Sequence, residues 1–576
     1  MPETQSSIIV MRRLVPWCAI PAAALVLQAC SAAPPAVVAG APIFANPRPP
    51  ASAPAAEIGV DFERRMEIEL AGIVAVREAA ARSVIAPHPA QRGVRSRPGA
   101  PISEEELQAQ RAAALLLAPA PAIQRLDGVA APRAVSPSLG TGFESLNYND
   151  APGATPPDPE LAVGPDHAVA VVNTSLEIYD KTGLSLVGPT TFSSLFAGVP
   201  SCGGLFDPNV LYDESADRYF LGIASGGSAF CIAVSQSSDP TGSWYLYRVP
   251  TAPGFFFDYP HTGVGEDVFV MGGNLFVGPN FDHAELYAIE KADAYSGSPL
   301  TVVSRTIAGF TPQPMNAHGF AQGTWPDDGL HYILNDAAFD GSSFGVFAWS
   351  DPLTTNLLFN IGTVDLDAFT GVFAGQALPF PQNGTSTMEG NDWRVQDAEY
   401  RNGHLWMAHT LSCNPGAGVV NCVRWAEIDP VTATVVQAGV IASDGEYRQF
   451  ADLAVNHCGD MTIGYTKSSS TTFPGVYATG RLGSDPPNTL GPELEVKPGE
   501  ILYTSFDDSP KRWGDYTGMT SDPDGIRTWY LGEYSENTGR TTRWGNYVQE
   551  FSTACMSLFA DGFEAGDTSA WSTTQP

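Results

Sequence analysis

Seven similar segments lie between residues 141 and 552, and aspartates recur at the start of most of them. Each segment holds a short apolar run, a polar turn and a second run that is strongly hydrophobic and aromatic. Six segments begin near an aspartate, and the fourth has Asn316 instead; the six are Asp158, Asp207, Asp258, Asp397, Asp452 and Asp515. A ring of these carboxylates would bind calcium or magnesium, because hard divalent cations prefer oxygen ligands. The alternative is that each carboxylate accepts backbone N–H bonds in the turn before its strand.

The repeat predicts the fold. A spacing of roughly 50 to 80 residues accommodates a four-stranded sheet with its loops. Such a sheet cannot bury both faces alone, whereas radial packing covers each face with the next sheet. The sequence therefore predicts an all-β chain, with a seven-bladed β-propeller over residues 141–556. The last copy supplies only three strands, and we expect residues 143–148, "FESLNY", to add the fourth and close the ring.

The tripeptide Ser-Asp-Pro occurs four times, beginning at Ser238, Ser350, Ser484 and Ser521. Aspartate at the first position of a turn accepts a hydrogen bond from the backbone two residues on, and proline presets φ for the second position. We interpret the motif as a turn between strands and not as a catalytic signature.

The N-terminal region resembles an export signal followed by a spacer. Residues 1–30 contain a basic start and a short apolar run that ends in "LQAC", which resembles a bacterial lipobox and implies lipidation of Cys30. Residues 31–140 are expected to be a low-complexity Ala/Pro tether with helical segments over residues 57–85 and 103–118. Ser103 and Glu106 are spaced as a capping box. Residues 557–576 form a short tail motif, interpreted as a sorting or docking tag.

Six cysteines lie beyond the signal, and an even number in an exported chain indicates disulfides. Six cysteines allow 15 connectivities. The arrangement within the repeats favours Cys202–Cys231, Cys413–Cys422 and Cys458–Cys555. A zinc site is disfavoured because no CxxC spacing occurs.

The composition of the chain disfavours some classes of binding partner. The net charge of −32 repels phosphate backbones, which disfavours nucleic-acid binding. No second apolar run approaches the length of a membrane span, so we expect contact with a membrane only through the lipid anchor. The sequence contains no HExxH pair, P-loop or dinucleotide fingerprint.

Several long motifs resemble those of secreted bacterial β-propeller proteins, most of which have no assigned activity. The motifs are "TPPDPELAVGP", "CIAVSQSSDPTGSWYLY" and "RWGDYTGMTSDPDG", and the resemblance covers about residues 140–552. It implies export and a propeller, and it does not imply a reaction.

The function expected from the sequence is a non-catalytic binding module for a surface polysaccharide or protein. We expect it to be a monomer that is lipid-anchored at the outer membrane or secreted, with calcium as its cofactor. The alternative is an extracellular glycan-active hydrolase or lyase with carboxylates at the mouth of the central channel. A scaffold in an envelope assembly would instead expose a large apolar patch. The long insertion at residues 365–396 is the place expected to set specificity.

Overall fold

The computed structural model describes residues 63–85, 102–120, 123–125, 134–151, 154–318, 325–326, 328–372, 375–506 and 509–555. Most of this part of the chain is β-strand arranged in antiparallel sheets, and the fold is propeller-like. The predicted signal (residues 1–30, with Cys30), the Ala/Pro stretch up to residue 56 and the tail from residue 557 lie outside the described residues.

Strands of the described chain form antiparallel groups of four, which we call units and number in chain order. Units 2 and 3 each gain one N-terminal strand, and units 4 and 5 are joined in one nine-stranded sheet by the parallel pair of β17 and β23. Unit 1 consists of β5 (Glu160–Val163), β6 (His167–Val172), β7 (Ser175–Asp180) and β8 (Ser185–Thr191). Unit 2 consists of β9 (Leu205–Asp213), β10 (Arg218–Ser225), β11 (Ala229–Ser235) and β12 (Ser243–Pro250). Unit 3 consists of β13 (Phe256–Val264), β14 (Val268–Val277), β15 (Asn280–Glu290) and β16 (Leu300–Ile307). Unit 4 consists of β17 (Phe310–Ala317), β18 (Leu330–Asp336), β19 (Ser343–Ser350) and β20 (Leu357–Asp365).

The remaining units follow the same order. Unit 5 consists of β23 (Ala398–Arg401), β24 (His404–Cys413), β25 (Val420–Asp429) and β26 (Thr434–Ala442). Unit 6 consists of β27 (Glu446–Val455), β28 (Met461–Ser469), β29 (Thr472–Arg481) and β30 (Leu494–Lys497). Unit 7 is β31 (Gly518–Ser521), β32 (Thr528–Ser535), β33 (Trp544–Ser552) and β4 (Ser138–Asn147). The prediction that "FESLNY" completes the last sheet is confirmed, because β4 pairs antiparallel with β33.

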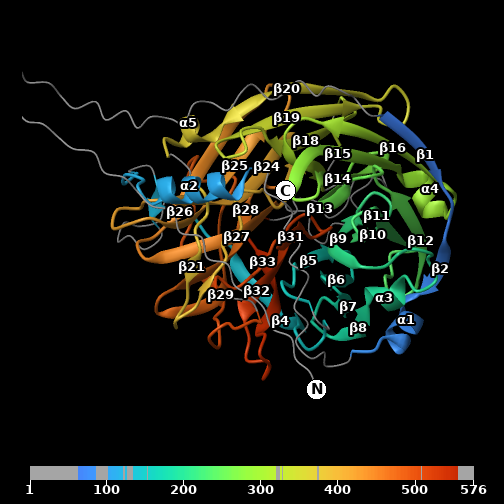
Figure 1. The fold of residues 1–576 in the computed structure, drawn as a ribbon, viewed down its shortest axis with the longest axis horizontal. Helices are drawn as coiled ribbons and strands as arrows, with labels where there is room; N and C mark the ends of the chain where they lie inside the picture. The colour runs from blue at the N-terminus through green and yellow to red at the C-terminus, as the bar shows by residue number, and fades with distance from the viewer. Residues whose placement is uncertain are drawn as a thin grey trace, which may run out of the picture. The chain divides into compact units, whose positions relative to one another are not determined.

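The first strands of the units form a closed cycle. Each contacts the first strand of the next unit, and β31 of unit 7 returns to β5 of unit 1. In Figure 1 the labels β5, β9, β13 and β31 gather near the middle of the view, and the later strands of their units lie further out. The cycle places one residue position from each unit around a common centre.

Hydrophobic side chains fill the space between neighbouring units. Every adjacent pair shares a buried cluster, including the pair formed by units 7 and 1. Trp244, Trp349, Trp425 and Trp529 are almost fully buried in four of these clusters. Nearly continuous hydrophobic strands are expected when both faces of a sheet are covered, because no face is left for polar alternation.

The segment before the first unit is not the helical tether expected over residues 57–85. It forms β1 (Glu63–Ile68), which pairs with β16, then β2 (Gly72–Ala75), which pairs with β12, and only then the short helix α1 (Val76–Arg82). The strand β1 alternates exposed and partly buried residues, as a half-covered edge strand does. The segment therefore covers open sheet edges of units 2 and 3, which limits edge-to-edge aggregation.

The second predicted helix is present as α2 (Glu104–Ala114). Ser103 Oγ accepts a hydrogen bond of 3.2 Å from the backbone N–H of Glu106, which is the N-terminal half of the predicted capping box. A two-residue strand, β3 (Gln124–Arg125), then pairs with β26. The other short helices are α3 (Phe192–Leu195), α4 (Lys291–Ser296) and α5 (Leu366–Thr370).

The Ser-Asp-Pro motifs are turns, as predicted. Three lie between the third and fourth strands of their units, and the fourth lies between β31 and β32. Asp239 Oδ1 accepts a hydrogen bond of 2.9 Å from the backbone N–H of Thr241, and Asp522 Oδ1 accepts one of 3.0 Å from Asp524. These carboxylates are used to hold turns.

Three disulfides pair the six cysteines as the sequence favoured: Cys202–Cys231, Cys413–Cys422 and Cys458–Cys555. The last spans 97 residues and joins the start of the β27–β28 turn in unit 6 to the residues that follow β33 in unit 7. Disulfides fit an extracellular protein, because they persist in oxidising compartments. Within the described ranges no helix is both long and apolar enough to cross a membrane.

Candidate functional site

The repeat-starting aspartates do not share one position in their units. Asp158 and Asp207 have left-handed backbone, with φ of 51° and 53°, and each precedes a proline. In units 3 and 4 the left-handed residues before proline are Tyr259 and Thr311, so Asp258 lies one residue earlier. In unit 6 the left-handed residue is Phe450, and Asp452 lies two residues later. The six carboxylates are therefore at different depths along the first strands.

Three of the aspartates interact with one arginine, and Asp258 interacts with two of these three aspartates. We call Asp158, Asp207, Asp258, Asp515 and Arg512 the Arg512 group. Arg512 Nη2 is paired with the Asp515 carboxylate, and its charge also acts on Asp158 and Asp207. Asp158 Oδ1 accepts a hydrogen bond of 2.7 Å from the backbone N–H of Asp515. Asp207 Oδ2 accepts one of 2.9 Å from Tyr516 Oη. The positive charge in this group is supplied by a side chain, and most carboxylate oxygens have protein donors.

Burial dominates the electrostatics of the Arg512 group. The relative exposures of Asp158, Asp207 and Asp258 are 1%, 8% and 3%. Burial, followed by repulsion from Asp515, raises the pKa of Asp207 to about 6. Burial and then the charge of Asp207 raise the pKa of Asp258 well above its ordinary value. A charged Asp207 thus disfavours ionisation of Asp258.

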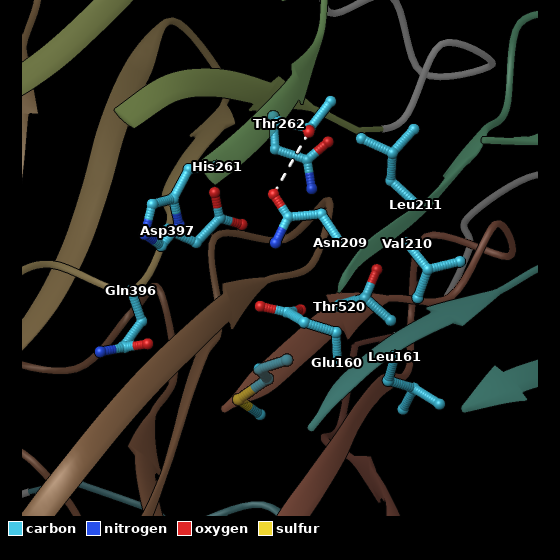
Figure 2. Close-up of a pocket in the computed structure, with 12 residues that line it drawn as sticks. Glu160, Leu161, Asn209, Val210, Leu211, His261, Thr262, Gln396, Asp397 and Thr520 are labelled. Carbon is cyan, nitrogen blue, oxygen red and sulfur yellow. Dashed lines mark hydrogen bonds between the residues drawn. The ribbon is translucent and has the colours of Figure 1, made fainter. Parts of the chain in front are cut away.

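A small cavity lies among the first strands (Figure 2). Its volume is about 30 Å³, and its polar lining comes from six units and includes Glu160, Asn209, His261, Asn316, Gln396, Asp397 and Thr520. A cavity needs roughly 10–15 Å³ to hold one water molecule, so this space accommodates waters or a single ion and not a sugar ring. Asp397 is the only one of the six predicted aspartates that lines it.

Carboxyl groups in and behind the cavity repel one another. Burial, then Asp452 and Asp397, raise the pKa of Glu160 well above its ordinary value. Burial raises the pKa of Asp397 to about 6, and burial and then Asp397 raise that of Asp452. Asp452 is held in place by the backbone of the next unit, because its Oδ2 accepts a hydrogen bond of 2.7 Å from the N–H of Met519.

The described parts of the insertion, residues 365–372 and 375–396, pack against other parts of the protein. Besides α5 it contains β21 (Phe380–Pro381) and β22 (Thr387–Met388), which pair with each other. Gln382 exchanges hydrogen bonds of 3.1 and 2.7 Å with the backbone of Tyr503. Phe380 and Met388 join a buried cluster with Tyr503, Trp513 and other residues that lead into units 1, 6 and 7. The insertion therefore packs over the approach to the first strands.

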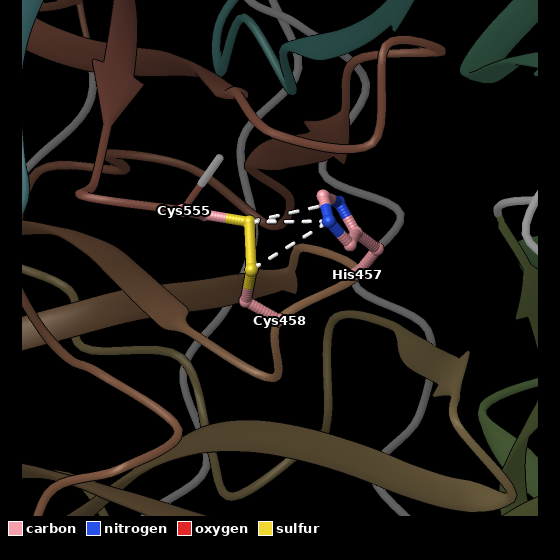
Figure 3. Close-up of side chains that lie close together, drawn as sticks. All are labelled: His457, Cys458 and Cys555. Carbon is pink, nitrogen blue, oxygen red and sulfur yellow. Dashed lines mark hydrogen bonds between the residues drawn. A yellow bond between two sulfur atoms is a disulfide. The ribbon is translucent and has the colours of Figure 1, made fainter. Parts of the chain in front are cut away.

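The described residues contain one group of three His, Cys, Asp or Glu side chains whose ligand atoms all lie within 4.8 Å: His457, Cys458 and Cys555 (Figure 3). The two cysteines form a disulfide, so neither offers a thiolate to a metal. His457 Nδ1 lies 2.6 Å from the carbonyl oxygen of Gly525. This group is a structural clip between units 6 and 7.

Aromatic side chains that recur near strand ends pack inside the protein. Trp244, Tyr247, Trp393, Trp406, Trp513, Tyr516, Trp529 and Trp544 are all buried, while Tyr245 and Trp325 are partly buried. The exposed large hydrophobic side chains on units 4 and 5 are instead Leu357, Phe359, Phe369, Val431 and Val436. These lie on or beside β20, α5 and β26, and β26 contacts both β20 and α5. We call these five residues the outer patch.

Sequence reasoning missed most of the cavity lining. Glu160, Asn209 and His261 each follow a proline that follows a left-handed residue: Asp158-Pro159-Glu160, Asp207-Pro208-Asn209 and Tyr259-Pro260-His261. The repeated proline followed by a polar residue was the signal that marks the position facing the centre. The aspartate before the proline marks the turn.

Comparisons with known proteins identify no family for this chain. No protein-family model matches the chain, and no curated protein matches it. Solved structures with similarity include Raptor from Chaetomium thermophilum, at 11% identity and a TM-score of 0.34, over 73% of this chain and 30% of that one. The chain thus spans about a third of the length of Raptor.

Two further structures are similar to the same degree. A polysaccharide lyase of family PL25, an ulvan lyase, has 8% identity and a TM-score of 0.33 over 56% of this chain and 76% of that one. The WD40 domain of SCAP from fission yeast has 9% identity and a TM-score of 0.31 over 72% and 98%. At these identities and TM-scores the similarity carries no argument about activity.

Proposed function

We propose that this chain is an exported seven-bladed β-propeller that binds a surface polysaccharide or protein without catalysing a reaction. The observation that carries the proposal is the closed centre. The cavity among the first strands holds about 30 Å³, and the aspartates of the Arg512 group are buried and bonded to protein donors. A polymer held by this protein therefore has to bind outside the centre.

The outer patch is the surface that we assign to the partner. Its exposed fractions run from 38% for Phe359 to 63% for Val431, although β20 and β26 belong to well-packed sheets. Contiguous exposed apolar side chains are typical of interaction sites in soluble proteins. The patch lacks tryptophan and tyrosine, so a protein partner fits it better than a polysaccharide does.

The remaining parts of the proposal follow from the N-terminal sequence. Lipidation at Cys30 would anchor the chain at the outer membrane, and cleavage as an ordinary signal would release it. The proposed protein acts as a monomer, and the net charge of −32 keeps it away from nucleic acid.

A glycan-active hydrolase or lyase is the second candidate. One observation favours it: burial and neighbouring carboxyl groups raise the pKa values of both Asp207 and Asp258, as happens for acid–base pairs in active sites. Their burial argues against it, because a substrate needs to reach the carboxyl groups. We therefore place this candidate second.

The test combines retention and product formation. The mature chain is incubated with bacterial and host polysaccharides and with envelope proteins, and retention and new reducing ends are measured together. We expect retention without new ends, and we expect Phe359→Ser with Val436→Ser to weaken it. Val277→Ser, which removes a side chain that is 52% exposed on unit 3, is the matched control. New reducing ends, or retention unaffected by the patch variant, would contradict the proposal.

A further inference from the structure

The central cavity carries polar atoms that have no protein partner. Gln396 Oε1, Asn316 Oδ1 and His261 Nε2 are buried and make no hydrogen bond, and the three residues are 6%, 7% and 4% exposed. All three line the cavity, together with the carboxyl groups of Glu160 and Asp397 (Figure 2). Buried polar groups in native proteins nearly always have a partner, so this concentration calls for a ligand.

The orientation of these atoms is set by their neighbours. Gln396 Nε2 donates to Tyr259 Oη at 3.4 Å and to the carbonyl oxygen of Asp515 at 3.2 Å, which leaves Oε1 on the other side of the amide. The His261 ring donates to the backbone of Gln396, so Nε2 keeps its lone pair. The unsatisfied atoms are therefore acceptors, and acceptors require a cation or a hydrogen-bond donor as ligand.

Nearby cationic side chains are already engaged. Arg394 pairs with Asp392 at 2.7 Å and lies over the Tyr259 ring at 3.9 Å. His318 lies 3.1 Å from Glu214 and 3.3 Å from Glu399. Burial raises the pKa of Asp397 and the charge of His318 lowers it, whereas burial and the neighbouring carboxyl groups Asp452 and Asp397 raise the pKa of Glu160. A bound cation would favour the ionised form of both carboxyl groups, and the volume of about 30 Å³ limits it to an ion with very few waters.

We propose that the central cavity binds one calcium ion through Glu160, Asp397, Gln396 Oε1 and Asn316 Oδ1, with water completing the coordination. His261 Nε2 accepts a hydrogen bond from the bound water. An oxygen-rich set with amide oxygens suits calcium, whereas magnesium keeps several waters and needs more room. The ligands come from units 1, 4 and 5, so the ion ties first strands together. This site differs from the predicted ring, of whose aspartates it uses only Asp397.

Binding is tested on the mature chain after dialysis against EGTA. Titration calorimetry with CaCl₂ and thermal unfolding with CaCl₂, MgCl₂ or MnCl₂ are compared for the wild type, Glu160→Gln and Asp397→Asn. Asp282→Asn, whose side chain is 48% exposed, is the matched control. We expect one site per chain, a saturable rise in the unfolding midpoint with calcium, and a loss of roughly tenfold or more in affinity for each cavity variant.

Three results would overturn the assignment: no calcium response in the wild type, cavity variants that bind as the wild type does, or loss of binding in the Asp282 control as well. If a cavity variant does not fold, wild-type crystals soaked in terbium decide the question. An anomalous peak between Glu160 and Asp397 supports the site, and peaks confined to the surface reject it.

Discussion

Asp158 in unit 1 accepts a hydrogen bond of 2.7 Å from the backbone N–H of Asp515 in unit 7. The other oxygen of the same carboxylate accepts a hydrogen bond of 2.5 Å from Asn173 Nδ2. Asp452 does the same between units 6 and 7, through the N–H of Met519. Carboxylates at the starts of the repeats thus join neighbouring units where the ring closes.

Asp158→Ala is expected to destabilise the fold. It removes the acceptor for two buried donors, which costs about 1–3 kcal/mol, and it places alanine in a left-handed conformation at about 1–2 kcal/mol more. Asp158→Asn keeps a residue that tolerates this conformation and should cost less. Urea unfolding measures both, with Asp282→Ala as control. A stable Asp158→Ala variant with altered ligand retention would mean that the carboxylate serves binding.

The N-terminal segment should behave as part of the folded body. Val76 in α1 is fully buried, whereas Val84 eight residues later is 74% exposed. Val76→Asp buries a charge and should release the segment or cost about 2 kcal/mol or more, while Val84→Asp should be neutral. Limited proteolysis between residues 63 and 85 reads out the release. Equal cleavage of the two variants would show that the segment is a free tether.

The Cys458–Cys555 disulfide should stabilise the closure of the ring. It constrains a loop of 97 residues, so replacing both cysteines by serine should lower the free energy of unfolding by about 2–4 kcal/mol. Replacing Cys413 and Cys422, which are only 9 residues apart, should cost less. Chemical denaturation compares the two. An equal or reversed order would argue against an entropic role in closure.

Glu536 should make stability depend on pH. Burial, then Glu144 and Glu500, raise its pKa from 4.5 to about 7. Between these values the folded state binds a proton that the unfolded state does not, so stability falls as pH rises through that window. Because the group is partly exposed, we expect a loss of about 1–2 kcal/mol from pH 4.5 to 8.

Glu536→Gln should remove that loss without changing stability near pH 4.5. Unfolding midpoints at pH 4.5 and 8 provide the measurement, with the exposed Glu105→Gln as control. A wild type and a Glu536→Gln variant with parallel pH profiles would show that Glu536 titrates normally.

The sequence predicted what the repeat determines. Alternating turns and apolar runs identified the strands, "FESLNY" was placed against the last sheet, and the cysteine pairs followed from their positions in the repeats. The expected helix over residues 57–85 was wrong where β1 and β2 form, because pairing with β16 and β12 outweighs helix propensity in "ERRMEI".

The residues that line the central cavity were harder to predict, because strand register decides which side chains face the cavity. A difference of one or two residues separates Asp158 from Glu160 and Asp258 from Tyr259, and it decides which side chain lines the cavity. The left-handed residues that set this register are a backbone property. Only the proline after some of them is visible in the sequence.

The central claim is that the buried carboxyl groups build the ring and perform no chemistry. The most direct test incubates a retained polysaccharide with the wild type and with Asp207→Asn, and follows polymer length and unsaturated ends over time. We predict constant polymer length with both proteins. Shortening by the wild type that is abolished in a folded Asp207→Asn variant would contradict the account and make the chain a glycan-active enzyme.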